Sequence, residues 1–170
     1  MHIPDFMKKD WMKKTEIRKS IIEDTPAILK IILAAYAPIE SILGRKPRGL
    51  LETEEKINER IKKETLYTVL FENDIIGTFT IDKNERVGLM EIQKVAIRPD
   101  MQNKGFGTFI MDSAEHLVRL MGEKVVVVET YQDVEQLVNF YLHRNYKTIS
   151  ERERMGNIVL LMEKKLWRED

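Results

Sequence analysis

The chain contains no cysteine among its 170 residues. This absence excludes disulfide bonds, cysteine metal sites and a thiol nucleophile. The three histidines, His2, His116 and His143, lie far apart in the sequence and form no pair of metal ligands. We therefore expect no metal site in this protein.

The chain also lacks an excess of charge of either sign. Lys and Arg together number 28, as do Asp and Glu, so the formal net charge is zero. This balance argues against bulk electrostatic binding of nucleic acid or of an anionic membrane. No uninterrupted apolar run reaches the length of a membrane span, and the N-terminal segment has no apolar stretch typical of a secretory signal. We expect a cytoplasmic enzyme or binding domain.

The length favours one domain with a full hydrophobic core. Residues 1–14 are predicted to be an N-terminal extension, either a partly ordered tail, which we favour, or a segment docked through Phe6, Met7 and Trp11. The domain itself is assigned to residues 15–170. Apolar periodicity predicts an α/β domain with a mixed sheet and the order β-α-α-β-β-β-α-β-α-β-β. The strands are expected at 15–22, 66–72, 75–81, 88–97, 124–129, 146–153 and 157–164. The first helix is expected to follow Pro26, with its end disturbed by Pro38. The other helices are expected at 53–64, at 105–121 and from Val134 to Leu142.

Glycine is scarce, with eight residues, yet two glycines stand one residue apart in VAIRPDMQNKGFGT, residues 95–108. Here a strand end passes into a polar turn and then into a helix. The free N–H groups and the dipole of a helix N-terminus attract anions, and glycines let a phosphate approach the backbone closely. Gly105 and Gly107 therefore suggest a pyrophosphate cradle, with Gln102 and Thr108 as side-chain donors and Lys104 as a nearby positive charge.

Two common nucleotide-binding patterns do not fit this loop. The pattern G-x-x-x-x-G-K-[ST] requires a lysine where Thr108 follows Gly107, and G-x-G-x-x-G requires a glycine where Ile110 stands. Taken alone, the glycine pair is explained equally well by a tight strand-to-helix turn with no ligand.

The wider context resembles one protein family. Gln102-x-x-Gly105-x-Gly107, after a strand that ends Val95-Ala96-Ile97, is similar to the acyl-CoA signature Q/R-x-x-G-x-G/A of the GNAT superfamily of N-acetyltransferases. The order of elements is similar to that fold along roughly residues 15–166. The segment FYLHRNY, residues 140–146, approximates a second signature, F-Y-x-x-x-G-[FY], with Asn145 in place of glycine. Asparagine tolerates a left-handed backbone better than most residues.

The resemblance implies that acetyl-CoA is the cosubstrate and lies where the fourth and fifth strands splay apart. Its pantetheine amides would pair with the main chain around Val95 and Ile97, and its pyrophosphate would sit on the backbone amides of residues 102–108. The cofactor-binding residues expected on this basis are Val95, Ala96, Ile97, Gln102, Asn103, Lys104, Gly105, Phe106, Gly107 and Thr108.

Acetyl transfer from a thioester to an amine needs a neutral amine, donors for the oxyanion and a proton for the departing thiolate. Tyr141 matches the family tyrosine that faces the sulfur of CoA, so the resemblance makes it the candidate acid. A phenol buried in the core is the competing interpretation. The oxyanion would be held by the backbone N–H near Val95 or Ile97.

Glu91 is the candidate base, because some GNAT enzymes carry a glutamate eleven residues before the position of Gln102. Strand periodicity predicts that Glu91 shares a face with Val95 and Ile97. The alternatives are a half-exposed carboxylate of no function and a water chain that does the work of the base.

Several charged residues near the first two helices and the last hairpin carry weaker predictions. Arg48 and its neighbours could contact the CoA 3′-phosphate, an acidic acceptor or nothing, and Glu52 with nearby glutamates could attract a cationic amine. The run Glu151-Arg-Glu-Arg154 is interpreted as a solvated turn rather than a substrate clamp.

The predicted function is an acetyl-CoA-dependent N-acetyltransferase that acts by direct transfer in a ternary complex. We rank a small amine or amino-group metabolite slightly above a peptide N-terminus or a protein lysine as acceptor. The alternative is a non-catalytic acyl-CoA-binding sensor or assembly module. The resemblance also leaves a homodimer open, through a surface that the sequence does not identify.

Overall fold

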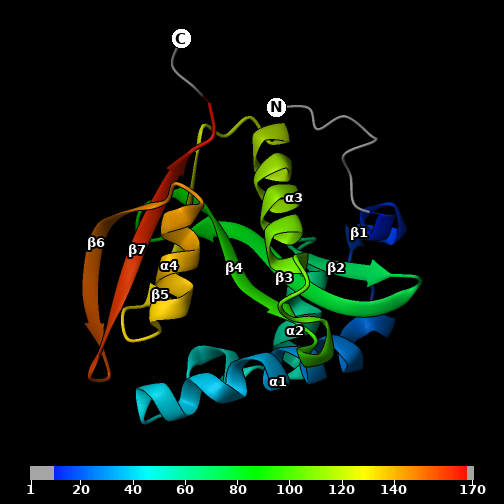
Figure 1. The fold of residues 1–170 in the computed structure, drawn as a ribbon, viewed down its shortest axis with the longest axis horizontal. Helices are drawn as coiled ribbons and strands as arrows, with labels where there is room; N and C mark the ends of the chain where they lie inside the picture. Colours follow the sequence, from blue (N-terminus) through cyan, green and yellow to red (C-terminus); the bar gives the residue numbers. More distant parts are fainter. Residues whose placement is uncertain (1–9, 168–170) are drawn as a thin grey trace.

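The fold is built on one seven-stranded sheet with the strand order β1-β2-β3-β4-β5-β7-β6 (Figure 1). A computed structural model describes residues 10–167. The strands are β1 (Thr15–Lys19), β2 (Leu66–Phe71), β3 (Asp74–Asn84), β4 (Leu89–Ile97), β5 (Val125–Tyr131), β6 (Lys147–Arg154) and β7 (Asn157–Lys165). The helices are α1 (Thr25–Leu43), α2 (Glu54–Lys62), α3 (Phe106–Leu120) and α4 (Glu135–His143). The predicted fold class and order of elements are confirmed.

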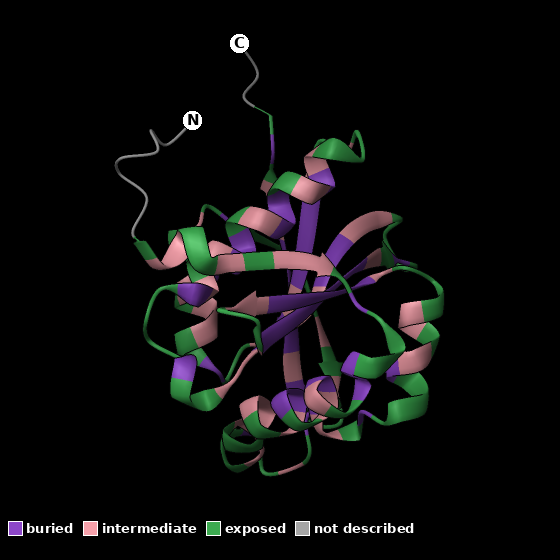
Figure 2. Ribbon diagram, turned by 90° about the vertical axis from the view of Figure 1, so that its right-hand side faces the viewer, coloured by how far each residue is buried: buried purple, intermediate pink, exposed green. Residues whose placement is uncertain are grey.

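Helices cover both faces of the sheet, and each face has its own apolar core. Helices α3 and α4 pack on one face through residues such as Ile110, Val118 and Tyr141. Helices α1 and α2 pack on the other through residues such as Ile28, Ile32 and Ile57. Figure 2 shows this layering, with buried central strands and helices whose outer surfaces are exposed.

A single parallel contact interrupts an otherwise antiparallel sheet. Strands β4 and β5 are parallel, and within residues 10–167 their register consists of one pair, Glu91 with Val127. Beyond this pair β4 has no register partner in β5. The two strands therefore diverge near the middle of the sheet, as the resemblance implied.

A β-bulge in β4 changes which residues share a face. Thr80 pairs with Gln93 and Thr78 pairs with Ala96, so two residues of β4 stand opposite Phe79 alone. One of these two residues, Lys94, has a φ of 49°. An extra residue in one strand shifts the alternation of its side chains by one position.

Helix α1 is longer than predicted. It continues through Pro38 to Leu43 and ends at Gly44, which has a φ of 71° and donates its N–H to the Glu40 carbonyl at 2.9 Å. Proline inside a helix leaves the carbonyl four residues earlier without its donor. That residue is Ala34, which is exposed, so water can bond the free carbonyl. The expected disturbance at Pro38 is therefore wrong.

By length and composition, the helical segment Ile22–Leu43 could cross a membrane, although it contains no uninterrupted apolar run of that length. The core helix of a water-soluble domain can pass the same test. Ile28 and Ile32 of this segment are fully buried against the sheet and α2.

The N-terminal segment that the structure describes contacts the domain through Trp11. Asp10–Lys14 form a short 3₁₀ helix, and the Trp11 ring packs on Phe106 with ring centroids 4.5 Å apart. Phe6 and Met7 lie outside the described residues, so the predicted boundary between extension and domain stays a prediction.

One buried carboxylate, Glu115 of α3, connects three elements. It is 2% exposed and accepts hydrogen bonds from Arg144 after α4, at 2.8 Å, and from Lys164 of β7, at 2.9 Å. The hydroxyl of Tyr146 also donates to it, at 3.3 Å. Two cations and a phenol thus compensate the burial of this charge.

Candidate active site

Two cavities lie beside β4. The larger one is at the end of this strand, between α1, α4 and the loop before α3, and has a volume of about 460 Å³. Most of the predicted cofactor residues line it. These are Val95, Ile97, Gln102, Asn103, Gly105, Gly107 and Thr108, and Tyr141 joins them from α4.

Three predicted cofactor residues do not line this cavity. Ala96 is 2% exposed and packs in the core under α1 and α2, on the opposite face of the sheet. The side chain of Phe106 is 3% exposed and packs in the core under α3. Lys104 is exposed at the surface. Side-chain contacts from Ala96 and Phe106 to a ligand in this cavity are therefore excluded, which leaves only their backbone groups.

The loop before α3 presents a row of free backbone donors. Asn103 and Gly105 have φ values of 59° and 93°, in the left-handed region. In the described chain, the N–H groups of residues 103–108 have no hydrogen-bond acceptor outside the helix, and the first turn of a helix offers them none inside it. The Gln102 side chain also lines the cavity, and its Nε2 donates to the Ile97 carbonyl at 3.1 Å.

A side chain at Gly105 and one at Gly107 would meet different surroundings. A Cβ on Gly105 would meet the Trp11 ring at 3.3 Å and would sit on a left-handed backbone. A Cβ on Gly107 would make ordinary contacts of 3.6 Å with Ile97 and 3.9 Å with Phe140. The protein alone thus requires glycine at Gly105, whereas the missing side chain at Gly107 enlarges the cavity.

Tyr141 presents a free phenol to the larger cavity. Its side chain is 8% exposed, and its hydroxyl makes no hydrogen bond with any residue between 10 and 167. Burial raises the pKa of Tyr141 to about 12, with Glu91 adding to the effect and Arg144 opposing it. The hydroxyl is therefore protonated at neutral pH. The turn after α4 forms as predicted, because Asn145 adopts a φ of 69°.

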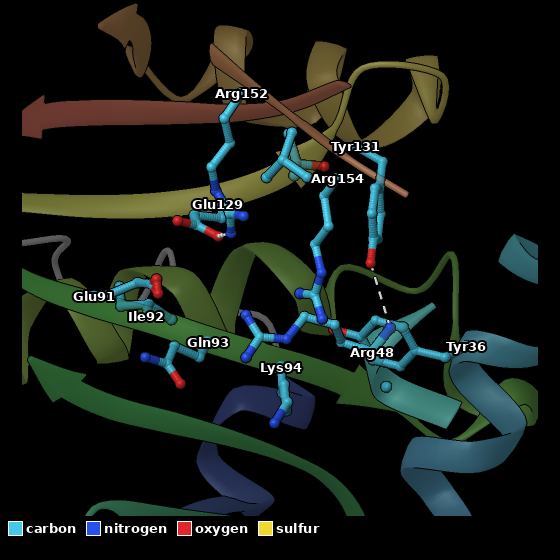
Figure 3. Close-up of a pocket in the computed structure, with 13 residues that line it drawn as sticks. Tyr36, Arg48, Glu91, Ile92, Gln93, Lys94, Glu129, Tyr131, Arg152 and Arg154 are labelled. Carbon is cyan, nitrogen blue, oxygen red and sulfur yellow. Dashed lines mark hydrogen bonds and ion pairs between the residues drawn. The ribbon is translucent and has the colours of Figure 1, made fainter. Parts of the chain in front are cut away.

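A second, smaller cavity of about 170 Å³ lies between β4, β5 and the loop after α1 (Figure 3). Tyr36 of α1 lines both cavities. Its ring lies directly on Gly49, where a Cβ would come within 2.3 Å of the ring. Tyr36 is thus the wall that the two cavities share, and the absence of a side chain at Gly49 makes room for it.

Glu91 faces the smaller cavity rather than the larger one. The prediction that it shares a face with Val95 and Ile97 is wrong, because the bulge at Lys94 reverses the alternation between them. Its carboxylate is 6% exposed and accepts a hydrogen bond from Asn84 at 3.2 Å. Burial raises the pKa of Glu91, against the opposing effects of Asn84 and of the nearby Arg48.

Arginines from the last hairpin also line the smaller cavity. Arg152 and Arg154 of β6 point toward its centre (Figure 3), so the interpretation of residues 151–154 as a solvated turn is wrong for these two side chains. The alternation Glu-Arg-Glu-Arg was the available signal, because it puts both arginines on one face of a strand. Arg48 joins them from the loop after α1.

The predicted attraction of a cationic amine by Glu52 is also wrong. Glu52 is 6% exposed and forms ion pairs with Arg60 and Lys94, both at 2.5 Å. Burial alone would raise its pKa, but these two cations lower it on balance. Its charge is therefore already compensated inside the protein.

The sequence of residues 29–146 matches the model of the acetyltransferase (GNAT) family. The chain belongs to the GNAT acetyltransferase family. The predicted family is confirmed, and with it the general activity, acetyl-CoA-dependent N-acetyl transfer. A comparison with curated proteins found no match.

Solved structures share the fold at low sequence identity. PaiA N-acetyltransferase from Thermoplasma acidophilum, solved with coenzyme A, has 20% identity and a TM-score of 0.70, over 89% of this chain and 98% of that one. YncA from Salmonella typhimurium, solved with acetyl-CoA, has 14% identity and a TM-score of 0.71, over 92% and 96%. The ribosomal-protein-S18-alanine N-acetyltransferase from Escherichia coli has 13% identity and a TM-score of 0.73, also over 92% and 96%.

Residues 10–167 contain no group of three or more His, Asp or Glu side chains placed to hold a metal ion. The polar groups that line the two cavities include backbone amides, phenols, carboxylates, arginines and the ammonium group of Lys94.

Proposed function

We propose that the chain transfers the acetyl group of acetyl-CoA directly to the primary amine of a small acceptor, within a ternary complex. The observation that carries this proposal is the pair of cavities that share Tyr36. One is lined by the free loop amides and Tyr141, and the other by a buried carboxylate, Glu91. Two neighbours of the same fold were solved with acetyl-CoA or coenzyme A, which supports the same cosubstrate here.

In this proposal acetyl-CoA occupies the larger cavity. Its pyrophosphate binds the free N–H groups of residues 103–108, where several backbone donors and the dipole of α3 favour negative charge. Its pantetheine arm runs along β4 at Val95 and Ile97. This stretch has no register partner in β5, so an extended ligand can add to it as another strand would.

Tyr141 supplies the proton for the leaving group. The amine nitrogen attacks the thioester carbonyl carbon, a C–N bond forms and the C–S bond breaks. The CoA thiolate then takes the proton of the Tyr141 hydroxyl, which solvent replaces later. A pKa of about 12 keeps this proton in place until the thiolate appears, and the hydroxyl has no competing partner in the described chain.

Glu91 receives the proton that the amine must lose, directly or through a water in the smaller cavity. An alkyl ammonium group has a pKa of about 10, far above that of an ordinary carboxylate. Because burial raises the pKa of Glu91, the difference between donor and acceptor becomes smaller, which favours proton transfer.

The size of the second cavity supports a small acceptor. Its volume of about 170 Å³ lies below the roughly 300–1,000 Å³ that is usual for sites of drug-sized ligands. A metabolite amine or a single terminal residue fits this volume. We rank the metabolite first, because the arginines and carboxylates around the cavity can bind several sides of a small polar molecule.

The test is release of free CoA thiol from acetyl-CoA in the presence of amines, amino acids, polyamines and peptides with free N-termini. Direct transfer predicts intersecting initial-velocity patterns and no acetylated protein by intact mass after incubation with acetyl-CoA alone. An acetylated protein intermediate would contradict direct transfer. Tight binding of acetyl-CoA with no thiol release across all classes would instead support the non-catalytic sensor module.

A further inference from the structure

The smaller cavity holds more positive charge than its carboxylates neutralise. Two carboxylates and four cationic side chains line it, namely Glu91, Glu129, Arg48, Lys94, Arg152 and Arg154. These charges differ in whether they have partners, and that difference decides what the cavity can bind.

Two of the cations are already paired. Arg152 bonds Glu129 at 3.2 Å, and Arg86 bonds the same carboxylate. Lys94 pairs with Glu52 outside the cavity. Neither Arg48 nor Arg154 has a carboxylate within ion-pair distance anywhere in residues 10–167. Both guanidinium groups project into the space between β4 and β5 (Figure 3).

The chain holds these two like charges near each other by contacts that do not neutralise them. The backbone N–H of Arg48 donates to the Tyr131 hydroxyl at 3.3 Å. Arg45 donates to the Arg154 carbonyl at 2.8 Å and to Asn157 at 2.7 Å. Arg45 therefore ties the loop after α1 to the hairpin of β6 and β7, and the two elements bring Arg48 and Arg154 together.

Mutual repulsion between the exposed Arg48 and the half-buried Arg154 is unfavourable until an anion binds. Burial lowers the pKa of Arg154, and the nearby charge of Arg48 lowers it further. A guanidinium group binds a carboxylate in a planar, bidentate geometry, and such charge-assisted bonds are stronger than neutral ones. An anionic group placed between Arg48 and Arg154 would therefore be held firmly, with Glu91 in the same cavity.

We infer that the acceptor carries a carboxylate as well as its amine, which makes it a molecule of the amino-acid class. Arg48 and Arg154 bind the carboxylate, while Glu91 faces the amine. The small volume of the cavity favours a carboxylate over a bulkier phosphate. This inference rests on the proposed function, since it names the substrate class of the same transfer.

The first experiment compares acceptors that differ only in the carboxylate. Amino acids, their carboxamides and the corresponding decarboxylated amines are each assayed by CoA thiol release. We expect kcat/KM to be at least about 100-fold higher for the carboxylated members. Equal kcat/KM for the three forms would overturn the inference and leave the transferase proposal intact.

The second experiment removes the guanidinium groups one at a time. Arg48→Gln and Arg154→Gln should each lower kcat/KM for a carboxylated acceptor by about 10- to 100-fold. Both should lower the weak reaction of the decarboxylated amine much less, so that the preference for the carboxylated acceptor falls. Arg119→Gln is the matched control, because Arg119 lies on α3 and lines neither cavity. A loss of equal size for all acceptors would overturn the inference.

A binding measurement separates this inference from the transfer proposal. N-acetylated amino acids, the products expected here, are titrated calorimetrically into the CoA-loaded protein. Binding that Arg48→Gln or Arg154→Gln weakens at least about 10-fold supports the carboxylate site, even if no amine is acetylated. No binding to the wild-type protein, or binding that neither variant changes, overturns the inference.

Discussion

Glu91 and Val95 present their side chains to opposite faces of β4, although an even number of positions separates them. The reason is the extra residue at Lys94, which stands in a two-against-one arrangement opposite Phe79. One strand thereby presents a buried carboxylate to the smaller cavity and an apolar contact to the larger one. Regular alternation would have placed both side chains on one surface of the sheet.

Replacement of Tyr141 by phenylalanine separates chemistry from cofactor binding. The ring keeps its packing against Phe140 and Tyr146, and only the free hydroxyl is lost. We expect kcat to fall about 10²- to 10⁴-fold, the usual contribution of a positioned general acid. Isothermal titration should show an acetyl-CoA Kd within about twofold of the wild type. Tyr67→Phe, in the core away from both cavities, is the control, and an unchanged kcat in Tyr141→Phe would remove Tyr141 from the mechanism.

Glu91→Gln should alter the pH profile of the reaction. Because burial raises the pKa of Glu91, wild-type kcat/KM should rise with pH as this carboxyl loses its proton, at a pH above the ordinary range of glutamate. The variant should lose this limb of the profile and about 10²- to 10⁴-fold of kcat/KM. A profile of the same shape in both proteins would show that another group or a water chain acts as the base.

The same substitution should stabilise the protein at neutral pH. A folded-state pKa above the unfolded value means that the folded protein binds more protons between the two pKa values. Stability therefore falls as pH rises through this window and stays lower above it. Thermal unfolding of Glu91→Gln should give a higher Tm than the wild type at pH 7, and the difference should shrink below the unfolded pKa. A lower Tm for the variant at pH 7 would contradict the cost assigned to this buried charge.

Gly105→Ala and Gly122→Ala form a matched pair. Both glycines have a positive φ, of 93° and 85°, but Gly105 lines the larger cavity and Gly122 has open space around it. A left-handed backbone should cost each alanine variant about 1–2 kcal/mol of unfolding free energy in urea denaturation, and Gly105→Ala should lose more because its Cβ meets the Trp11 ring at 3.3 Å. Gly105→Ala alone should weaken acetyl-CoA at least about 10-fold, because the free loop amides must move. Equal Kd values in the two variants would argue against a pyrophosphate on this loop.

Glu115→Ala tests the buried ion cluster under α3. Removal of this carboxylate leaves Arg144 and Lys164 without their shared partner, so we expect a loss of about 3–5 kcal/mol of unfolding free energy. Asp112→Ala removes a carboxylate that also bonds Arg144 but is 59% exposed. Its loss should be about 0–1 kcal/mol. Similar losses of unfolding free energy in the two variants, measured by urea denaturation, would contradict the larger contribution assigned to the buried carboxylate.

Most of the fold could be read from the sequence because its signals are local. Apolar periods of about two or about 3.6 residues identify strands and helices, and each such pattern lies within one short segment. The prediction of a disturbed helix end at Pro38 failed for a physical reason. Pro38 lies at a point of α1 where the carbonyl that it leaves without a donor is open to water. The loop of Gly105 was also a local signal, because strand, turn and helix start follow one another directly.

The smaller cavity could not be predicted because its parts meet only in three dimensions. Arg48 follows α1, Glu91 lies in β4 and Arg154 closes β6. No spacing in the sequence connects these positions, and Arg154 resembled an ordinary surface charge. The bulge at Lys94 was equally hidden, since it depends on the register between β3 and β4 rather than on the residues of β4.

The contact between Trp11 and the loop before α3 gives the protein a built-in optical probe. The Trp11 ring lies beside Gly105 and packs on Phe106 and Phe109, so a ligand seated on that loop changes its surroundings. The chain has two tryptophans. The second, Trp167, lies near the C-terminal end of the sequence and is 54% exposed. With Trp167 replaced by phenylalanine, the intrinsic fluorescence would come from Trp11 alone. Occupancy of the loop could then be followed in real time, without a label and in the absence of any acceptor.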